Sequence, residues 1–410
     1  MRTALYICYF SLRDPLTRTQ VVAYLAGLRR SGFRIHLLTF EPRHVPAADL
    51  TAWREELAGQ GIEWSFLSYH NRPALLATLY DILRGALWIV RFARRRPVGL
   101  LHGRSHVGAA MARLAWFWVR TPYIFDFRGL LADEYVDAGH WQRGGLRYRI
   151  TKRAERGLLR SADAVVVLTR ALRDELLRLG LAGRDQRPLI VIPCAVDTEA
   201  FALSRTEREQ QRRQRGWEHR RVIVYVGKLG GVYLVEEMAR FFAALRRHAP
   251  NCLFRIATQS APDALATALA RVGLCEGSVE IGGVPPEQMA SMLSAADGGV
   301  ILYRPGESLR GRFPTKLGEY LAAGLPVAAS PLAEDCEDLL RQRRVGLVLG
   351  SFEEATLDSA AQELLALVDE PGTRTRCQAC AREELSLAEI GVPRYAALYQ
   401  RFLRSLESDG

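Results

Sequence analysis

The stretch RFPTKLGEYLAAGLPVAAS, residues 312–330, combines a helix signal with a strand signal and decides the fold class. Pro314 and Thr315 suit the first turn of a helix, which the periodicity predicts over 315–323. The apolar run PVAAS directly after it predicts a buried strand. Because helices alternating with buried strands build parallel sheets covered by helices, the fold class indicated is α/β.

The same alternation extends from this stretch in both directions and runs twice along the chain. With 410 residues the chain is too long for one core, so two domains are expected. We predict a first doubly wound parallel-sheet domain over residues 1–198 and a second over 199–391. A closing helix over 392–410 is expected to cross back onto the first domain. The N-terminal run TALYICYF is interpreted as a first strand, not as a signal peptide.

The composition is that of a globular protein with an excess of positive charge. Hydrophobic residues make up 49% of the chain, and the formal net charge is +11. This excess indicates an anionic partner. Nucleic acid is not expected, because the basic residues are dispersed and no aromatic-basic recognition motif is present. The charge-dense segment 204–221 is interpreted as a solvated helix and linker in preference to a nucleic-acid contact.

Seven cysteines are scattered along the chain, which indicates reduced thiols in a cytoplasm. Cys377 and Cys380 form the only close pair, on an expected helix. No second pair or histidine cluster completes a zinc site there. A metal or redox role for this pair is therefore not expected.

The segment 79–103 is the longest apolar candidate, and Arg84, Arg91 and the run 94–96 interrupt it. These arginines argue against a membrane-spanning helix. Two interpretations stay open for this amphipathic helix. It either packs on a sheet with an arginine-rich outer edge, or it makes a peripheral contact with an anionic membrane.

Charged residues follow the predicted strands in both halves of the chain. Asp126 and Arg128 lie at the end of one strand, Lys228 follows VIVYVG, and Arg304 follows GGVILY. Ligands of open α/β sheets bind outside the carboxyl ends of the strands. We therefore expect these side chains to face a cleft between the two domains.

The helix over 315–323 has the features of an anion site. Its first-turn N–H groups are exposed to a ligand, with Thr315 as the expected N-cap and Lys316 adding a positive charge. Glu319 is placed to hydrogen-bond a pair of vicinal hydroxyls, as a nucleotide with its phosphate at the helix mouth would require. A capping box is the structural alternative, but Thr315 and Glu319 are four residues apart, one too many for that motif.

Several segments in order resemble one known family. FPTKLGEYLAAGLPV, VIPCAVDTEAF, VIVYVGKLGG and SAADGGVILY are similar to segments of the nucleotide-sugar-dependent glycosyltransferases of family 4. FDFRGLLADEYVDAGHW and KRAERGLLRSADAVVVLT resemble a bacterial surface-polysaccharide subgroup. The resemblance covers nearly the whole chain. It implies a GT-B fold of two Rossmann-like domains and a retaining glycosyl transfer.

The resemblance also implies roles for individual residues, mostly in the second domain as the donor-binding domain. Glu319 matches the second glutamate of the family's paired-glutamate motif and is expected to bind the donor ribose. Lys228 matches a basic residue that holds the donor diphosphate. Further contacts to the donor phosphates and sugar are expected from Arg304, Ser308, Arg310, Thr315 and Lys316.

The chain departs from the family pattern at several positions. Gly311 stands where the first glutamate of the pair is expected, so the sugar contact falls to Glu307, Ser308 or loop amides. Tyr233 and Leu234 occupy the place of a second basic residue. Asp126 replaces the usual histidine after a strand of the first domain, and SLRDPLTRTQ replaces a glycine-rich loop.

The first domain is expected to bind the acceptor. Asp126 would orient the acceptor hydroxyl or the sugar, and Arg128 would pair with Asp126 or Glu134. A salt-linked loop network without a catalytic role is the alternative. His106 is named as an acceptor contact, against the common alternative of a histidine at a helix start. Diphosphate charge would be neutralised by basic residues and the helix N-terminus, with no Asp-x-Asp metal motif and no cofactor.

The expected function is transfer of a sugar from a UDP- or GDP-linked donor to a hydroxyl of a lipid-linked or surface glycan. The expected location is cytoplasmic, at the inner face of the plasma membrane if the membrane contact forms. Two alternatives remain open. One is a GT-B sugar-nucleotide epimerase, which needs dedicated acids and bases, and the other is a non-catalytic nucleotide-sugar-binding module.

Overall fold

The computed structural model of the chain describes residues 2–183, 186–274 and 277–403. The chain divides into two compact units. The N-terminal unit comprises residues 1–132, 143–193 and 388–410, and the C-terminal unit comprises 133–142 and 194–387. Cys275 and the last part of the expected closing helix, 404–410, lie outside the described residues.

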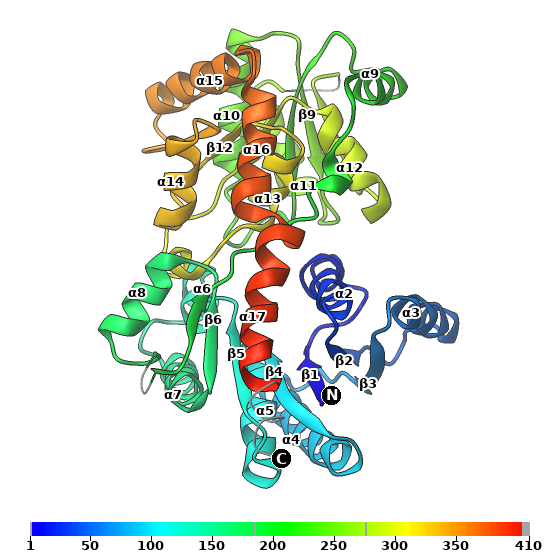
Figure 1. Cartoon of the computed structure of the whole chain (residues 1–410). Helices are drawn as coiled ribbons and strands as arrows, with labels where there is room; N and C mark the ends of the chain where they lie inside the picture. The colour runs from blue at the N-terminus through cyan, green and yellow to red at the C-terminus, as the bar shows by residue number, and fades with distance from the viewer. Residues whose placement is uncertain (1, 184–185, 275–276, 404–410) are drawn as a thin grey trace. The chain divides into compact units, whose positions relative to one another are not determined.

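The N-terminal unit is built on a seven-stranded sheet with the order β3-β2-β1-β4-β5-β6-β7 (Figure 1). All neighbouring strands are parallel. The central strands are buried along their whole length, which explains their nearly continuous apolar sequences. The strands are β1 (Thr3–Ile7), β2 (Arg34–Glu41), β3 (Glu63–Ser68), β4 (Val98–Arg104), β5 (Tyr123–Phe127), β6 (Ala164–Val167) and β7 (Leu189–Val191).

Helices of the N-terminal unit cover this sheet. α4 and α5 share a hydrophobic core with the central strands, while α2 packs against β2. The helical segments are α1 (Pro15–Thr17), η1 (Arg18–Val22), α2 (Ala23–Arg30), α3 (Ala47–Gly59), α4 (Ala74–Arg95), α5 (Ser105–Val119), α7 (Leu146–Ser161), α8 (Arg170–Arg178) and α17 (Val392–Leu403). Between α5 and α7 lies α6 (Leu131–Asp137).

The C-terminal helix α17 belongs to the N-terminal unit. It packs against α2 and β4. The Tyr399 hydroxyl lies 2.7 Å from Nδ1 of His102 on β4, and Arg394 donates to the carbonyl of Val191 at 3.0 Å. The tyrosine ring is fully buried, so α17 completes the core of this unit.

The C-terminal unit repeats the plan with a six-stranded parallel sheet in the order β10-β9-β8-β11-β12-β13. Two parallel doubly wound sheets confirm the α/β prediction. The strands are β8 (Arg221–Val226), β9 (Cys252–Ala257), β10 (Val279–Gly282), β11 (Gly298–Ile301), β12 (Val327–Ala329) and β13 (Gly346–Val348). The helical segments are η3 (Glu199–Phe201), α9 (Arg205–Gln214), α10 (Val235–His248), α11 (Asp263–Arg271), α12 (Pro286–Ala295), η4 (Glu307–Gly311), α13 (Thr315–Ala322), α14 (Glu334–Gln342), α15 (Glu354–Asp369), α16 (Thr373–Leu385) and η5 (Leu387–Gly391).

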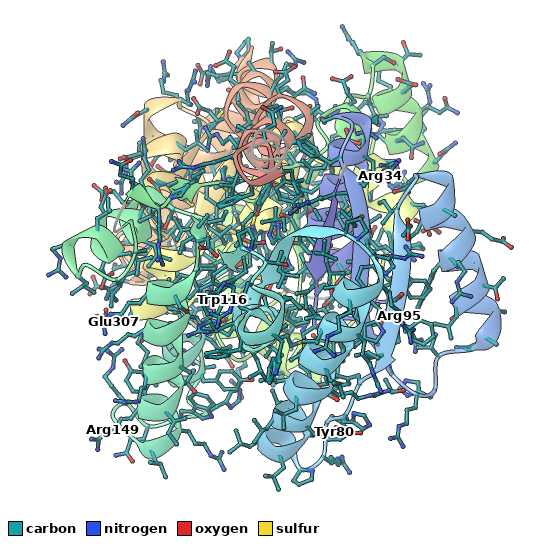
Figure 2. All side chains as sticks on the ribbon, turned by 60° about the horizontal axis from the view of Figure 1, so that its bottom comes forward. Arg34, Tyr80, Arg95, Trp116, Arg149 and Glu307 are labelled. Atoms are coloured by element: carbon teal, nitrogen blue, oxygen red, sulfur yellow. The ribbon has the colours of Figure 1, made fainter. Side chains whose placement is uncertain are left out.

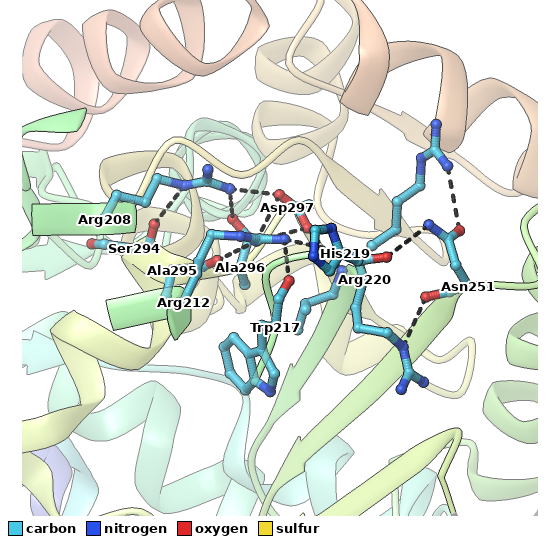
Figure 3. A network of polar contacts seen from close by, with 12 residues as sticks. Arg208, Arg212, Trp217, His219, Arg220, Asn251, Ser294, Ala295, Ala296 and Asp297 are labelled. Atoms are coloured by element: carbon cyan, nitrogen blue, oxygen red, sulfur yellow. Dashed lines mark hydrogen bonds and ion pairs between the residues drawn. The ribbon is translucent and has the colours of Figure 1, made fainter. Parts of the chain in front are cut away.

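The charge-dense segment 204–221 is more than a solvated linker, which corrects the prediction. Ser204 and Glu207 form a capping box that starts α9. Arg212 is buried, with 8% of its surface exposed, and lies 3.0 Å from the Asp297 carboxylate. It also donates to the carbonyls of Ala295, Trp217 and Arg220 (Figure 3). Through these contacts Arg212 connects α9 to the segment that leads into β11.

None of the six described cysteines forms a disulfide, and all six are buried. Burial raises the pKa of Cys377 and Cys380 to about 12, so both remain protonated thiols. Along the described part of the chain, no helix has the length and apolar character needed to cross a membrane.

Candidate functional site

The candidate site of the C-terminal unit lies where β8 ends and α13 begins. Tyr320 of α13 is fully buried, and its hydroxyl accepts a hydrogen bond from the Val226 N–H at 2.8 Å. Gly299 of β11 makes room for this ring, since a Cβ there would lie 2.4 Å from it. The tyrosine therefore fixes the helix start beside the end of β8.

Lys316, in the first turn of α13, is buried among three tyrosines. Its Nζ lies 4.5 Å from the ring centre of Tyr225, 4.9 Å from that of Tyr233 and 5.6 Å from that of Tyr303. We call these three residues the tyrosine cluster. Cation–π attraction stabilises an ammonium in such a cluster. Among the described residues, no hydrogen-bond acceptor contacts this Nζ.

Gly227 follows β8 and leaves space for the lysine. Its φ of +141° favours glycine, and a Cβ at this position would lie 2.9 Å from the Lys316 Nζ. The next residue, Lys228, is exposed. Its backbone carbonyl accepts a hydrogen bond from the Tyr225 hydroxyl. One buried and one exposed lysine therefore lie at the turn after β8.

Two side chains of α13 have pKa values that burial shifts toward neutral pH. Burial lowers the pKa of Lys316 to about 7, although the Glu319 carboxylate acts in the opposite direction. Burial raises the pKa of Glu319 to about 6, and the lysine opposes this rise. Glu319 is half-buried. The site therefore holds a cation and a carboxylate that both titrate near neutral pH.

The expected N-cap role of Thr315 is wrong. Pro314 occupies the N-cap position in extended conformation, α13 begins at Thr315, and no side chain caps the helix. Proline has no N–H to be satisfied, which suits this place before the helix. The N–H groups of the first turn therefore keep no side-chain cap, and Thr315 itself is half-buried.

The loop before α13 contains the remaining predicted donor residues. Ser308 is buried, and its N–H donates to the Asp137 carboxylate at 2.8 Å. Arg304 is exposed, and its backbone N–H donates to the Val232 carbonyl at 2.7 Å. Arg310 forms an ion pair with Glu307.

Arg312 and Glu134 form a further ion pair beside this loop. Arg312 lies over the ring of Tyr303 at 5.2 Å and 3.7 Å from the Glu134 carboxylate. Glu134 therefore pairs with Arg312, whereas the sequence suggested Arg128. Asp137 and the tyrosine cluster were missed by sequence reasoning. The one available signal was the position of Tyr225 and Tyr303 at or just after strand ends.

The candidate site of the N-terminal unit is a buried group at the ends of β1, β4 and β5, which we call the Asp126 cluster. The Asp126 carboxylate is fully buried and lies 3.5 Å from Arg104 and 3.6 Å from both Arg128 and His102. The Tyr6 hydroxyl lies 3.4 Å from it. The predicted pairing of Asp126 with Arg128 is therefore present.

Electrostatics keep Asp126 ionised. Burial alone would raise its pKa, but Arg128, His102 and Arg104 together hold the pKa well below the usual range. Burial lowers the pKa of His102, so this imidazole is neutral near pH 7. The Asp126 carboxylate is therefore an enclosed anion held between two guanidinium groups.

His106, predicted as an acceptor contact, instead contacts a carboxylate of α7. Its Nε2 lies 3.1 Å from the Glu155 carboxylate of α7, which also binds Lys152 at 2.6 Å. Its ring packs against Phe125 and Phe127. His106 therefore ties α5 to α7 in the interior, as the helix-start alternative implied. Within the described residues, no group of three His, Cys, Asp or Glu side chains forms a metal site.

Comparisons with known proteins identify the family of the chain. Residues 17–195 match the family model for a glycosyl transferase 4-like domain, and residues 220–368 match that for glycosyl transferases group 1. Two units that are each built on a parallel, helix-covered sheet have the architecture of a GT-B glycosyltransferase. The chain belongs to the glycosyltransferase family that these two domain models describe.

Solved structures share the fold over nearly the whole chain. HepE of Anabaena, solved in complex with UDP, is 16% identical, with 97% of this chain and 100% of that chain covered and a TM-score of 0.72. Sucrose-phosphate synthase of Thermosynechococcus elongatus is 16% identical, with full coverage of both chains and a TM-score of 0.73. WaaG, a glycosyltransferase involved in lipopolysaccharide biosynthesis, is 16% identical, with coverage of 96% and 99% and a TM-score of 0.66. No curated protein sequence matches the chain.

Proposed function

We propose that this glycosyltransferase moves a sugar, with retention of configuration, from a nucleoside-diphosphate donor to a hydroxyl of a lipid-linked or surface glycan. The C-terminal unit binds the donor, and the N-terminal unit binds the acceptor. UDP is the favoured nucleotide because the similar HepE was solved with UDP and with UDP-glucose. The observation that carries the proposal is the buried Lys316 ammonium, unmatched by a hydrogen-bond acceptor of the described chain, beside the Gly227 turn.

The donor would be held by successive parts of one site. The diphosphate lies at the first turn of α13, where uncapped N–H groups, Lys316 and Lys228 neutralise its charge. The Glu319 carboxylate accepts hydrogen bonds from the ribose hydroxyls. Arg304, Ser308, Arg310 and Thr315 complete the donor contacts, as the family resemblance implies.

The transfer requires no protein nucleophile. The acceptor oxygen bonds to the anomeric carbon on the face from which the diphosphate leaves, and the anomeric carbon–phosphate oxygen bond breaks. The hydroxyl proton passes to the departing phosphate oxygen. Stabilising the charge on this leaving group is the main contribution of the protein. The reaction proceeds without a metal or other cofactor in this proposal.

On the acceptor side, Arg128 and Arg104 are the groups that contact the acceptor or sugar. Asp126 positions both guanidinium groups through its ion pairs. His106 takes no part in this proposed chemistry, because it is engaged with Glu155. The protein works in the cytoplasm at a membrane face, which agrees with its net charge of +11.

A panel of UDP-, GDP- and dTDP-sugars tests the function, with nucleoside diphosphate release measured with and without membrane extract. Release that depends on the extract is expected for one donor. Interconversion of sugar nucleotides without release would favour the epimerase, and binding without turnover would favour the non-catalytic module.

Substitutions test the donor site directly. Glu319→Ala and Lys228→Ala are each expected to weaken UDP binding about tenfold or more, measured by titration calorimetry. Glu334→Ala and Arg213→Ala, at exposed positions of α14 and α9, are the matched controls and should bind UDP as the parent does. Unchanged affinity in both site variants would show that the site lies elsewhere.

A further inference from the structure

We propose that the outer faces of α4, α5 and α7 form one docking surface for a bilayer with anionic lipid headgroups. This inference deepens the proposed membrane-face function by naming the surface and the lipid class. α5 packs against both α4 and α7, so the three helices are continuous within the N-terminal unit. The surface is defined by the exposed apolar side chains Leu75, Leu76, Leu79, Tyr80, Leu83, Leu87, Phe117, Trp118, Leu146 and Ile150.

α4 is apolar on two faces, one in the core and one at the surface. Ala86, Ile89 and Val90 are buried in the core of the unit. The opposite side carries six large apolar side chains that are all more than half exposed, and Leu75 reaches 73%. Their spacing of three, four and seven residues places them along one face of the helix. The inner face of α4 is therefore covered by the core of the unit, and a second apolar face remains at the surface.

The end of α5 adds aromatic side chains. Phe117 and Trp118 are both more than half exposed. The Arg113 guanidinium lies 4.4 Å from the ring centre of Phe117, so charge and aromatic surface alternate here. Trp, Tyr and Arg together are characteristic of the interfacial region of a bilayer.

The start of α7 continues the pattern. Leu146 is 75% exposed and Ile150 lies one turn further, with more than half of its surface exposed. Arg147 and Arg149 lie between and beside them and are also exposed. Figure 2 views the molecule from this side, with Tyr80 of α4 and Arg149 of α7 at its outer edge.

The exposed charge on these helices is of one sign. α4, α5 and α7 contain eleven Lys and Arg residues and two acidic residues, a net charge of +9 against +11 for the whole chain. Both acidic residues, Asp81 and Glu155, are buried. Basic residues near a membrane surface attract anionic lipid. Most of the net positive charge of the protein is therefore carried by the helices that expose these apolar side chains.

This charge selects the occupant. A second copy of the chain would bring two such positive surfaces together, which like-charge repulsion opposes. An anionic bilayer offers phosphate groups to the arginines and an apolar layer to the leucine and aromatic side chains at the same time. An acidic protein partner would have to offer both anionic groups and an apolar surface across all three helices.

Vesicle co-sedimentation of the full-length protein tests the proposal. The parent is expected to bind vesicles of phosphatidylcholine mixed with phosphatidylglycerol, and not vesicles of phosphatidylcholine alone. Leu79→Ser with Leu83→Ser, and separately Arg149→Gln with Arg153→Gln, should each lower binding about tenfold. The controls are Leu177→Ser with Leu179→Ser, which have similar exposure at the end of α8, and Arg205→Gln with Arg213→Gln on α9.

The outcomes separate this proposal from the glycosyltransferase function. UDP affinity is measured on every variant, and it should be the same as in the parent. A parent that binds UDP but no anionic vesicle would overturn the docking surface while leaving the donor site intact. Equal loss in control and surface variants would overturn it too. So would a parent dimer, seen by light scattering, that Leu79→Ser with Leu83→Ser dissociates.

Discussion

Lys316 shows how burial prepares a residue for its ligand. Its ammonium is removed from water by the tyrosine cluster, and the other charged groups that act on it are Glu319 and Arg312. Three aromatic faces stabilise the charge only in part, so the pKa falls to about 7. A doubly charged phosphate beside this nitrogen would restore the charge. Binding of the proposed donor is therefore linked to uptake of a proton.

The pH dependence of UDP binding follows from this linkage. Above about pH 7 the free site loses the Lys316 proton while the bound site keeps it, so affinity should fall as pH rises, by at most about tenfold per pH unit. Below about pH 6 Glu319 becomes protonated and loses its acceptor role, so affinity should also fall there. Calorimetric titration with UDP from pH 5 to pH 9 measures both limbs of this profile. The upper limb is the fall in affinity above about pH 7, and the lower limb is the fall below about pH 6.

Lys316→Arg provides the control for the upper limb. The guanidinium keeps its charge throughout this range, so the upper limb should flatten while the lower limb remains. An identical upper limb in the parent and in this variant would mean that another group titrates, and the linkage to Lys316 would be disproved.

At the scale of elements, α9 shows how a charge-dense helix becomes part of a core. The capping box starts the helix, and Arg212 anchors it through Asp297, which also accepts a hydrogen bond from the Val222 N–H at 2.8 Å. The helix is thereby joined to the first strand of the C-terminal unit. Burying an ion pair stabilises a fold only when its remaining groups are hydrogen-bonded, as they are here.

Adjacent arginines of α9 make a matched test of this role. Arg212→Ala removes one of the two arginine partners of Asp297 and the donor to three backbone carbonyls, and it should lower the free energy of unfolding by about 3 kcal/mol or more. Arg213→Ala, at an exposed position, should change it by less than about 0.5 kcal/mol. Urea unfolding measures both. Similar values for the two variants would contradict the structural role of Arg212.

Sequence reasoning found the elements of this chain more surely than the partners of its side chains. Periodicity predicted the helix over 315–323 and the strand after it, because local spacing fixes both. The tyrosine cluster brings together residues from three separate segments, and spacing along the chain contains no information about such contacts. Arg212 was assigned to solvent for the same reason, since its neighbours in sequence are all polar. His106 and Glu155 likewise meet only through the packing of α5 on α7.

At the scale of the whole molecule, the N-terminal unit takes its last helix from the end of the chain. α17 supplies Tyr399, whose ring and hydroxyl contact His102, and Tyr395, whose ring packs against Tyr24. His102 in turn lies beside Asp126. The far end of the chain thus supports the buried cluster that positions the arginines of the proposed acceptor site.

Tyr399→Phe tests this support. Loss of the hydroxyl leaves the buried His102 Nδ1 without its partner, which should lower the free energy of unfolding by about 1–3 kcal/mol. Transfer to the acceptor should slow while UDP affinity, which we assign to the C-terminal unit, stays unchanged. Tyr80→Phe, at an exposed position of α4, is the control. A variant with parent stability and transfer rate would contradict the role of α17.

The origin of α17 also has a consequence for synthesis on the ribosome. Residues 1–193 emerge first, but the helix that covers α2 and β4 lies beyond residue 387. At about 5–20 residues per second, roughly ten to forty seconds pass before that helix is made. During this interval the N-terminal unit exposes the surface of Tyr24 and Phe33 that α17 later buries. Until α17 is made, these two aromatic rings therefore lack the cover that the folded protein gives them.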